Sequence, residues 1–278
     1  MTETVSLYGR RRWPRQRWCL LAAGFVGCFL LGVAFAGLIR RTGDWSHGLP
    51  WERTLMIRLH HPLPPLLDGL IVVLPWLGTN LTLIPAVAFV VIWLWRKQRR
   101  RDLAVQLAVA QLGSYLLNPS LKAMFARERP DLFERRGWFG WSSYPSGHAI
   151  ASVAVLMTLA IVVHRVKGWR WAYAVAGTVM LATMYSRLYL AVHWPTDVLA
   201  GAIVGTAWLQ VSTIAFREPF ADDAPLVTAS AVEHAAELGE IDVPAAHDGS
   251  DSLALAEGDG SSEDGGGRGR TGGLGEEL

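Results

Sequence analysis

Long apolar runs alternate with short polar stretches along the first 216 residues of the chain. Uncharged runs cover residues 18–39, 69–95, 103–121, 149–163, 171–186 and 198–216. Most of them approach or exceed the length of about 20 residues that crosses a hydrocarbon core. The runs at 149–163 and 171–186 reach this length only if their flanks join the helices. The pattern predicts an all-α fold, a polytopic membrane helical bundle with six transmembrane helices.

The run at 69–95 is too long for a single span. Pro75, Gly78 and Pro85 interrupt it. Proline removes a backbone N–H donor from a helix, and glycine weakens a helix through its conformational freedom. We therefore expect an interfacial or re-entrant helix at 66–77 and the second span at 79–95.

Composition agrees with a membrane protein and divides the chain by charge. Hydrophobic residues make up 51% of the 278 positions, and there are 13 Trp, which is too apolar for an ordinary soluble protein. Residues 221–278 contain 14 acidic and 2 basic residues, whereas residues 1–220 contain 10 acidic and 24 basic ones. The tail is rich in Gly, Ser and Ala and too polar to form a core, so we expect it to be disordered.

The basic N-terminus helps to predict the orientation of the protein in the membrane. The stretch GRRRWPRQR before an apolar run resembles a signal peptide, but the run of 22 residues exceeds the core of about 7–15 in such signals, which favours an uncleaved helix. Basic clusters at 10–17, 96–101 and 165–170 favour the cytoplasmic side. We expect both termini in the cytoplasm of a cell-membrane protein and the loops 122–148 and 187–197 on the extracytoplasmic face. A cysteine at Ser142 should then react from outside, and one at Gln98 only from inside.

Three polar clusters lie at span ends on that extracytoplasmic face. They read KAMFARERP at 122–130, YPSGH at 144–148 and SRLYLAVHWPTD at 186–197. Lys122, Arg129 and Arg187 supply positive charge, and arginine presents a planar fork that matches phosphate oxygens. Ser146 followed by Gly147 is typical of a helix start, where backbone N–H groups bind anions. The clusters predict a site for an anion such as phosphate.

Two histidines and a carboxylate add chemistry to this site. His148 lies at the start of the fourth span, His193 just before the sixth, and Asp197 four residues later, after Pro195 in a predicted first helical turn. Asp197 can hold one ring nitrogen of His193 as an N–H donor, which leaves the other lone pair free to attack phosphorus. His148 could protonate the departing oxygen and later accept a proton from water.

These residues resemble the type 2 phosphatidic acid phosphatase superfamily, integral-membrane lipid phosphatases that share a helical core with vanadium haloperoxidases. The first motif of that family, Lys, six residues, Arg-Pro, is matched by Lys122, Arg129 and Pro130. The second, Pro-Ser-Gly-His, is matched by residues 145–148, and the third, Ser-Arg, five residues, His, three residues, Asp, by Ser186, Arg187, His193 and Asp197. All three occur in order without a departure, which is far more specific than one short motif.

The resemblance covers roughly residues 60–216 and implies a lipid phosphatase core there. It implies a phosphohistidine on His193, no metal and no other cofactor, and a membrane lipid with a phosphate or diphosphate head group as substrate, with no nucleic-acid partner. It also implies a phosphate held by a set of five residues, namely Lys122, Arg129, Ser146, Gly147 and Arg187. The remaining chain then divides into a basic N-terminus at 1–17, a first helix and outer loop at 18–59, and an acidic tail at 217–278.

Taken one at a time, these residues have ordinary explanations. A lone Lys or Arg can anchor a span at the interface, and a lone Ser-Gly, His or Asp can belong to a helix start or a wet loop. Their conjunction favours a phosphatase for undecaprenyl diphosphate or phosphatidic acid. Two alternatives stay open: a lipid phosphotransferase with an alcohol acceptor, and a non-catalytic lipid-phosphate binder or transporter, which would not need His193 with Asp197. Haloperoxidase activity is less favoured, because those relatives are usually soluble.

Overall fold

The computed structural model describes residues 4–5, 15–136, 140–217 and 227–228 of the chain. The chain divides into two units, 1–5 with 227–278 and 6–226. In the first unit, Thr4–Val5 (β1) pairs antiparallel with Val227–Thr228 (β2). The rest of the tail predicted to be disordered, and most of the basic N-terminus, lie outside the described residues.

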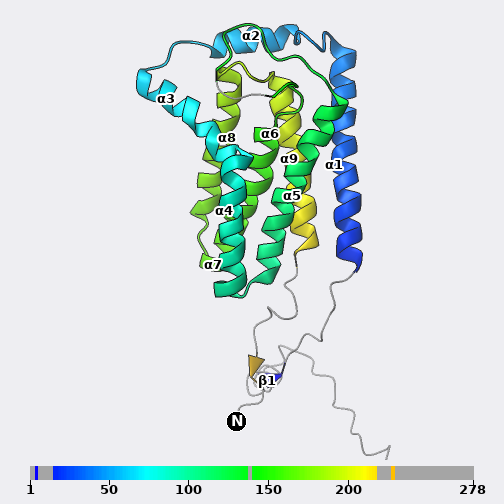
Figure 1. Ribbon diagram of the computed structural model, residues 1–278, viewed down its shortest axis with the longest axis vertical. Helices are drawn as coiled ribbons and strands as arrows, with labels where there is room; N and C mark the ends of the chain where they lie inside the picture. The colour runs from blue at the N-terminus through cyan, green and yellow to red at the C-terminus, as the bar shows by residue number, and fades with distance from the viewer. Residues whose placement is uncertain (1–3, 6–14, 137–139, 218–226, 229–278) are drawn as a thin grey trace, which may run out of the picture. The chain divides into compact units, whose positions relative to one another are not determined.

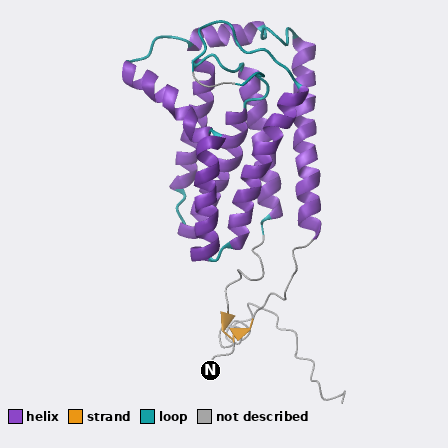
Figure 2. Ribbon diagram, viewed as in Figure 1, coloured by secondary structure: helices purple, strands orange, loops and turns teal. Residues whose placement is uncertain are grey.

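The described part of the second unit is helical (Figures 1 and 2). In chain order its elements are α1 (Arg15–Thr42), α2 (Pro50–Leu59), α3 (Pro65–Val73) continued by a 3-10 turn (Leu74–Gly78), α4 (Asn80–Trp93) continued by a π turn (Leu94–Gln98), α5 (Arg101–Met124), α6 (Gly147–Ala151), a π turn (Ser152–Leu156), α7 (Met157–Lys167), α8 (Trp171–Tyr189) and α9 (Pro195–Ala215). The prediction of an all-α fold is confirmed.

Single residues determine where α7 ends and where α9 begins. Ala151 and Leu156 keep helical backbone angles, so α6, the π turn and α7 form one continuous rod, which Gly168 ends with a φ of +73°. A left-handed glycine is a common helix C-terminus because it carries no Cβ. Pro195 occupies the first turn of α9, as the sequence predicts, since its fixed φ suits that position.

Four helical segments in the described part are long and apolar enough to cross a membrane. They are Arg15–Thr42, Asn80–Gln98, Gly147–Lys167 and Pro195–Ala215. The segments α5 and α8, of 24 and 19 residues, run beside them in the same bundle but are less apolar, and α5 buries Gln106, Gln111 and Ser114. A bundle with six spans therefore stays a prediction for those two helices.

The expected break in the long apolar run is present. Thr79 has extended backbone angles and separates the 3-10 turn after α3 from α4. The helix α2, in contrast, was not predicted, because the sequence PWERTLMIRL mixes charged and apolar residues without a long apolar run.

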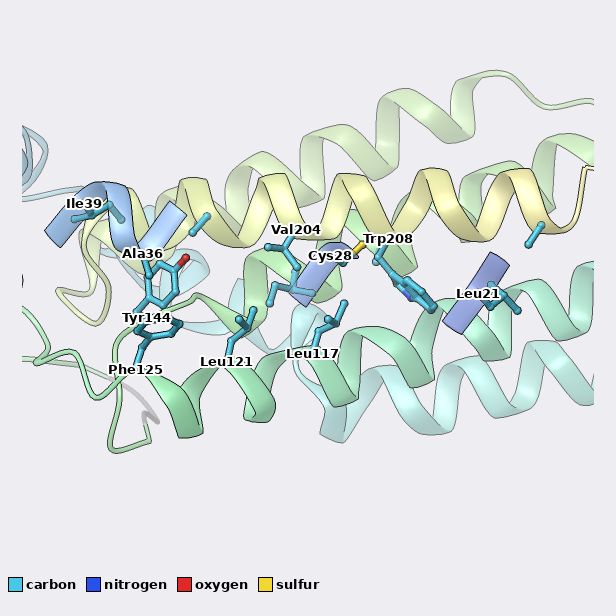
Figure 3. Close-up of a cluster of buried hydrophobic side chains, with 14 of the residues drawn as sticks. Leu21, Cys28, Ala36, Ile39, Leu117, Leu121, Phe125, Tyr144, Val204 and Trp208 are labelled. Carbon is cyan, nitrogen blue, oxygen red and sulfur yellow. The ribbon is translucent and has the colours of Figure 1, made fainter. Parts of the chain in front are cut away.

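The largest buried hydrophobic cluster joins α1, α5 and α9 (Figure 3). Val204 and Trp208 of α9 face Leu117 and Leu121 of α5, and α1 contributes Leu21, Cys28, Ala36 and Ile39. The hydroxyl of Tyr144 donates a 2.6 Å hydrogen bond to the Gly32 carbonyl of α1. This packing anchors the loop before α6 to α1 and so fixes the region that carries the predicted motifs.

Candidate active site

The three motif clusters meet at one end of the helical bundle, where α2 and the loops after α5 and α8 gather (Figure 1). Lys122 lies in the last turn of α5 and Arg187 in the last turn of α8. Lys122, Arg129, Arg187 and His193 all lie close enough to His148 to act on it electrostatically. The structure thus brings together predicted site residues from all three motif clusters.

The predicted anion-binding helix start is present at α6. Ser146 is the N-cap, and its hydroxyl accepts a 3.4 Å hydrogen bond from the Ala149 N–H. The first N–H groups of a helix have no partner inside the helix, so they are available to an anion. At Gly147 a Cβ would lie 2.6–2.8 Å from the side chain of Asn118, so a larger residue there requires Asn118 to move. Asn118 was not among the residues that the sequence indicated.

The carboxylate of Asp197 is fully buried, and both of its oxygens accept hydrogen bonds. Oδ1 accepts one from Arg127. Its Oδ2 accepts a 2.8 Å hydrogen bond from the Trp194 N–H and another from the Ser143 hydroxyl. Nδ1 of His193 lies 3.8 Å from the same oxygen, which is an ion-pair distance rather than a hydrogen bond. Among the described residues, this nitrogen has no hydrogen-bond partner. The predicted pairing of His193 with Asp197 is therefore present as proximity.

His193 is in an environment that disfavours its charge. It lies in the loop before α9 and is 4% exposed. Burial, with smaller effects of nearby Arg129 and Lys122, lowers the pKa of its imidazole to about 3, against the opposing effect of Asp197. A neutral imidazole with a free lone pair is the form that can act as a nucleophile or a general base.

The cationic side chains are held by backbone carbonyls. Lys122 donates a 2.7 Å hydrogen bond from Nζ to the Ser142 carbonyl. Arg129 donates to the carbonyls of Gly140 at 2.8 Å, of Ser142 at 2.9 Å, and of Val192. Burial lowers the pKa of Arg129 to about 10, which still leaves it charged at neutral pH.

A cavity opens beside Arg129 on the surface of the loop between α5 and α6. Its volume is about 480 Å³, and Arg129 shares its lining with Glu128, Asp131, Arg135, Gly140 and Trp141. Of the predicted phosphate-binding residues, Arg129 lines this cavity.

One expectation about the same loop is wrong. Ser142 is fully buried, and its hydroxyl donates a 2.7 Å hydrogen bond to the Phe125 carbonyl. The sequence suggested a polar loop position open to solvent, but the carbonyl and hydroxyl of Ser142 are both part of the packing around Lys122 and Arg129. A labelling probe must be placed elsewhere in the loop.

Four buried residues next to the site were missed by the sequence analysis. Arg127, between two motif cations, donates to Asp197 Oδ1 at 2.7 Å and to Glu52 Oε2 at 2.9 Å. Thr196 contacts both Arg127 and Glu52, and Ser143 contacts Asp197. Arg127 carried only a weak signal, as a third cation in a motif that needs two, and Glu52 carried none.

Comparisons with known proteins agree with these observations. Residues 103–220 match the model of the PAP2 superfamily. The chain is 29% identical over 153 residues to an undecaprenyl-diphosphatase of Sulfolobus acidocaldarius, covering 53% of this chain and 69% of that protein. It is 30% identical over 133 residues to the putative undecaprenyl-diphosphatase YbjG of Escherichia coli, covering 45% of this chain and 62% of that protein.

Two further comparisons, one by sequence and one by structure, are with Bacillus subtilis. The phosphatidylglycerophosphatase B of that organism is 37% identical over 95 residues, or 32% of this chain and 46% of that protein. The crystal structure of its transmembrane PAP2 type phosphatidylglycerolphosphate phosphatase is similar with a TM-score of 0.59 and 23% identity, over 68% of this chain and 94% of that one. The likeness to this structure concerns the fold.

Proposed function

Because residues 103–220 identify the chain as a member of the PAP2 superfamily, we propose that it hydrolyses a lipid phosphate or lipid diphosphate through a phosphohistidine on His193. The activity class is that of a lipid phosphate phosphohydrolase in a membrane. The observation that carries the finer proposal is the position of His193, neutral through burial, 3.8 Å from Asp197 and near the cations Arg129 and Lys122.

The first chemical step assigned to this site is attack on phosphorus. The lone pair of Nε2 of His193 forms a bond to phosphorus, and the bond between phosphorus and the leaving oxygen breaks. Asp197 faces Nδ1 and stabilises the positive charge that develops on the ring. His148 donates a proton to the departing oxygen, so the lipid leaves as an alcohol or as a monophosphate.

The second step is hydrolysis of the phosphohistidine. His148, now without its proton, accepts one from water, and the water oxygen bonds to phosphorus while the bond to Nε2 breaks. The products are inorganic phosphate and the original imidazole. Lys122, Arg129 and Arg187, with the Ser146 hydroxyl and the Gly147 N–H, bind the phosphate oxygens in both steps and stabilise the charge that develops on them.

A lipid substrate suits the location of the site. The motif residues lie at the ends of helices, so a phosphate can bind there while the hydrocarbon chain stays among the helices or in lipid. The names of the relatives suggest undecaprenyl diphosphate and phosphatidylglycerophosphate as candidates, and phosphatidic acid belongs to the same chemical class. We expect the site on the extracytoplasmic side, on the evidence of the basic cytoplasmic turns.

Phosphate release from purified protein tests this function. The protein in detergent is given undecaprenyl diphosphate, phosphatidylglycerophosphate or phosphatidic acid, and inorganic phosphate is measured for wild type and His193→Ala. The variant should lose several orders of magnitude in rate, because it lacks the nucleophile. His61→Ala, at an exposed position, is the control and should keep the wild-type rate.

Three results would contradict the proposal. Residual hydrolysis by His193→Ala at about a tenth or more of the wild-type rate would remove His193 as the nucleophile. Phosphorylated product that forms only when an alcohol is added would identify a phosphotransferase instead. Lipid binding by the wild type without turnover of any of the three lipids would indicate a non-catalytic binder.

A further inference from the structure

Two carboxylates and one guanidinium form a buried network beside the proposed nucleophile. The side chains of Glu52, Arg127 and Asp197 are each 0% exposed. They come from α2, from the loop after α5 and from the first turn of α9. Glu52 lies upstream of residues 103–220, the part of the chain that matches the superfamily model.

Arg127 is held on all three guanidinium nitrogens. Nη1 donates to Asp197 Oδ1 and to the Thr196 hydroxyl, both at 2.7 Å, and Nη2 donates to Glu52 Oε2 at 2.9 Å. Nε donates to the Trp45 carbonyl at 2.8 Å. The guanidinium carbon also lies 5.0 Å from the ring centre of Trp45 and 5.7 Å from that of Trp194. A planar fork fixed at this many points has one orientation, which a lysine could not reproduce.

Glu52 ties α2 to the start of α9. Its Oε1 accepts hydrogen bonds from the Thr196 N–H at 3.0 Å and from the Thr196 hydroxyl at 2.6 Å. Its Oε2 accepts from Arg127 and, at 2.8 Å, from the N–H of Leu49 at the start of α2. Glu52 thus holds Thr196, the residue before Asp197, and Arg127 holds Asp197 itself.

The consequence appears at the carboxylate of Asp197. Arg127 occupies Oδ1, so the carboxylate cannot rotate without losing that bond, and Oδ2 is left facing His193 at 3.8 Å. The guanidinium of Arg127 is fully engaged with the two carboxylates, Thr196 and Trp45. It is therefore directed at Asp197 rather than at a bound phosphate.

We propose that Glu52 and Arg127 are positioning residues for the reaction, which act through Asp197 by fixing the carboxylate oxygen that faces His193. This inference rests on the proposed function, because it assigns the network to the orientation of the nucleophile. A displacement of about 1 Å in a reacting group can cost about 100-fold in rate. Loss of the network should therefore lower kcat and leave KM nearly unchanged, since the phosphate-binding side chains are untouched.

Three variants separate positioning from folding. Arg127→Gln removes the fork, Arg127→Lys keeps a positive charge without the planar geometry, and Glu52→Gln keeps the volume while weakening the hold on Thr196 and Arg127. Arg58→Gln, an exposed change on the same helix α2, is the matched control. For each, kcat and KM are measured with the lipid that the wild type hydrolyses, and the folded fraction is measured by size-exclusion chromatography in detergent. The time course of alkali-stable phosphoenzyme, trapped by rapid quenching and measured per folded molecule, gives the rate of the first step.

The expected results are graded. Per folded molecule, Arg127→Gln should lose about 100-fold in kcat, and Arg127→Lys and Glu52→Gln about tenfold, with KM and inhibition by vanadate within about twofold of wild type. The first step, formation of the phosphoenzyme, should slow by the same factors. Arg58→Gln should match the wild type.

The inference is wrong if Arg127→Lys and Glu52→Gln both keep kcat within about twofold per folded molecule, or if KM alone changes. These two variants decide the question even where Arg127→Gln does not fold. Failure of the proposed function looks different, since the wild type would then release no phosphate or His193→Ala would remain active. Wild-type activity that is lost in His193→Ala but kept in the network variants would overturn this inference alone.

Discussion

The backbone N–H of Ser146 donates a 3.0 Å hydrogen bond to the main-chain carbonyl of Asp197. This bond joins the N-cap of α6 to the first turn of α9, and so joins the second sequence motif to the third. The helix start proposed to bind phosphate and the loop with the proposed nucleophile are therefore held to each other. Directly below this bond the two helices approach closely at glycines of α9.

Gly201 permits that close approach. A Cβ at this position would lie 2.5 Å from the Ser146 carbonyl oxygen and 2.8 Å from the Ala149 Cβ, and the first of these is a backbone atom that cannot turn aside. Gly201→Ala should therefore separate α6 from α9, destabilise the protein by about 1–3 kcal/mol, and lower phosphate release per folded molecule. Thermal unfolding in detergent measures the first effect and a phosphate assay the second.

Gly177→Ala on α8 is the matched control. A Cβ there meets nothing within 4 Å, so this variant should unfold at or slightly above the wild-type temperature, because alanine favours a helix over glycine. Equal unfolding temperatures and equal activity for the two variants would show that the close approach at Gly201 is not required.

Stability should depend on pH through His193. Burial lowers the pKa of its imidazole below the ordinary value of 6.5, so the unfolded chain binds a proton at this residue before the folded protein does. The contribution of His193 to the free energy of unfolding is therefore fully present above pH 6.5. It decreases as the pH falls towards the folded pKa of about 3. One such group contributes up to about 1.4 kcal/mol per pH unit in that window.

The comparison with His193→Gln isolates this effect from other titrating groups. The free energy of unfolding is measured between pH 7.5 and pH 5 for both proteins. The wild type should lose more stability on acidification than the variant, which has no proton to bind at this position. Parallel curves would mean that the pKa of His193 is the same in the folded and unfolded protein.

Activity should not depend on a divalent metal ion. The motif residues His148, His193 and Asp197 are assigned to proton transfer, attack on phosphorus and orientation of the ring, and His193 and Asp197 are held by contacts within the protein. We expect full turnover in excess chelator and inhibition by vanadate, which mimics phosphate among the cationic side chains. Turnover that stops with chelator and returns with one added divalent ion would point to a different mechanism.

The sequence predicted the helices and the motif convergence for one physical reason. Apolar runs determine where helices cross the membrane, and the ends of those helices bring Lys122, His148 and His193 close together. The same reasoning found the break at Thr79 and the start of α9 at Pro195, because proline and glycine act locally.

The buried network could not be predicted in the same way. Glu52 and Arg127 are 75 positions apart, and no spacing rule relates an acid on a short amphipathic helix to an arginine in a loop. Ser142 was expected to be exposed because nothing in the local sequence of this polar loop indicates burial. It is buried because of its tertiary contacts with Lys122 and Phe125. Such contacts appear only when the whole fold is known.

The last prediction concerns the side of the membrane that the site faces. The basic turns at 96–101 and 165–170 lie at the end of the bundle where α1 begins, opposite the motif residues (Figure 1). Basic turns favour the cytoplasm, so the motif residues should face outward. Glu134 is exposed in the motif loop and Gln98 is exposed at the opposite end, so a single cysteine at each position reports on one side.

The experiment uses a background with Cys19 and Cys28 replaced by alanine, in intact cells. Glu134→Cys should react with a membrane-impermeant thiol reagent, whereas Gln98→Cys should react only after permeabilisation. Both proteins should keep phosphatase activity, because neither residue belongs to the site. The reverse labelling pattern would invert the topology and assign the phosphatase to lipids of the cytoplasmic leaflet, because the motif loop and the proposed nucleophile lie at the same end of the bundle.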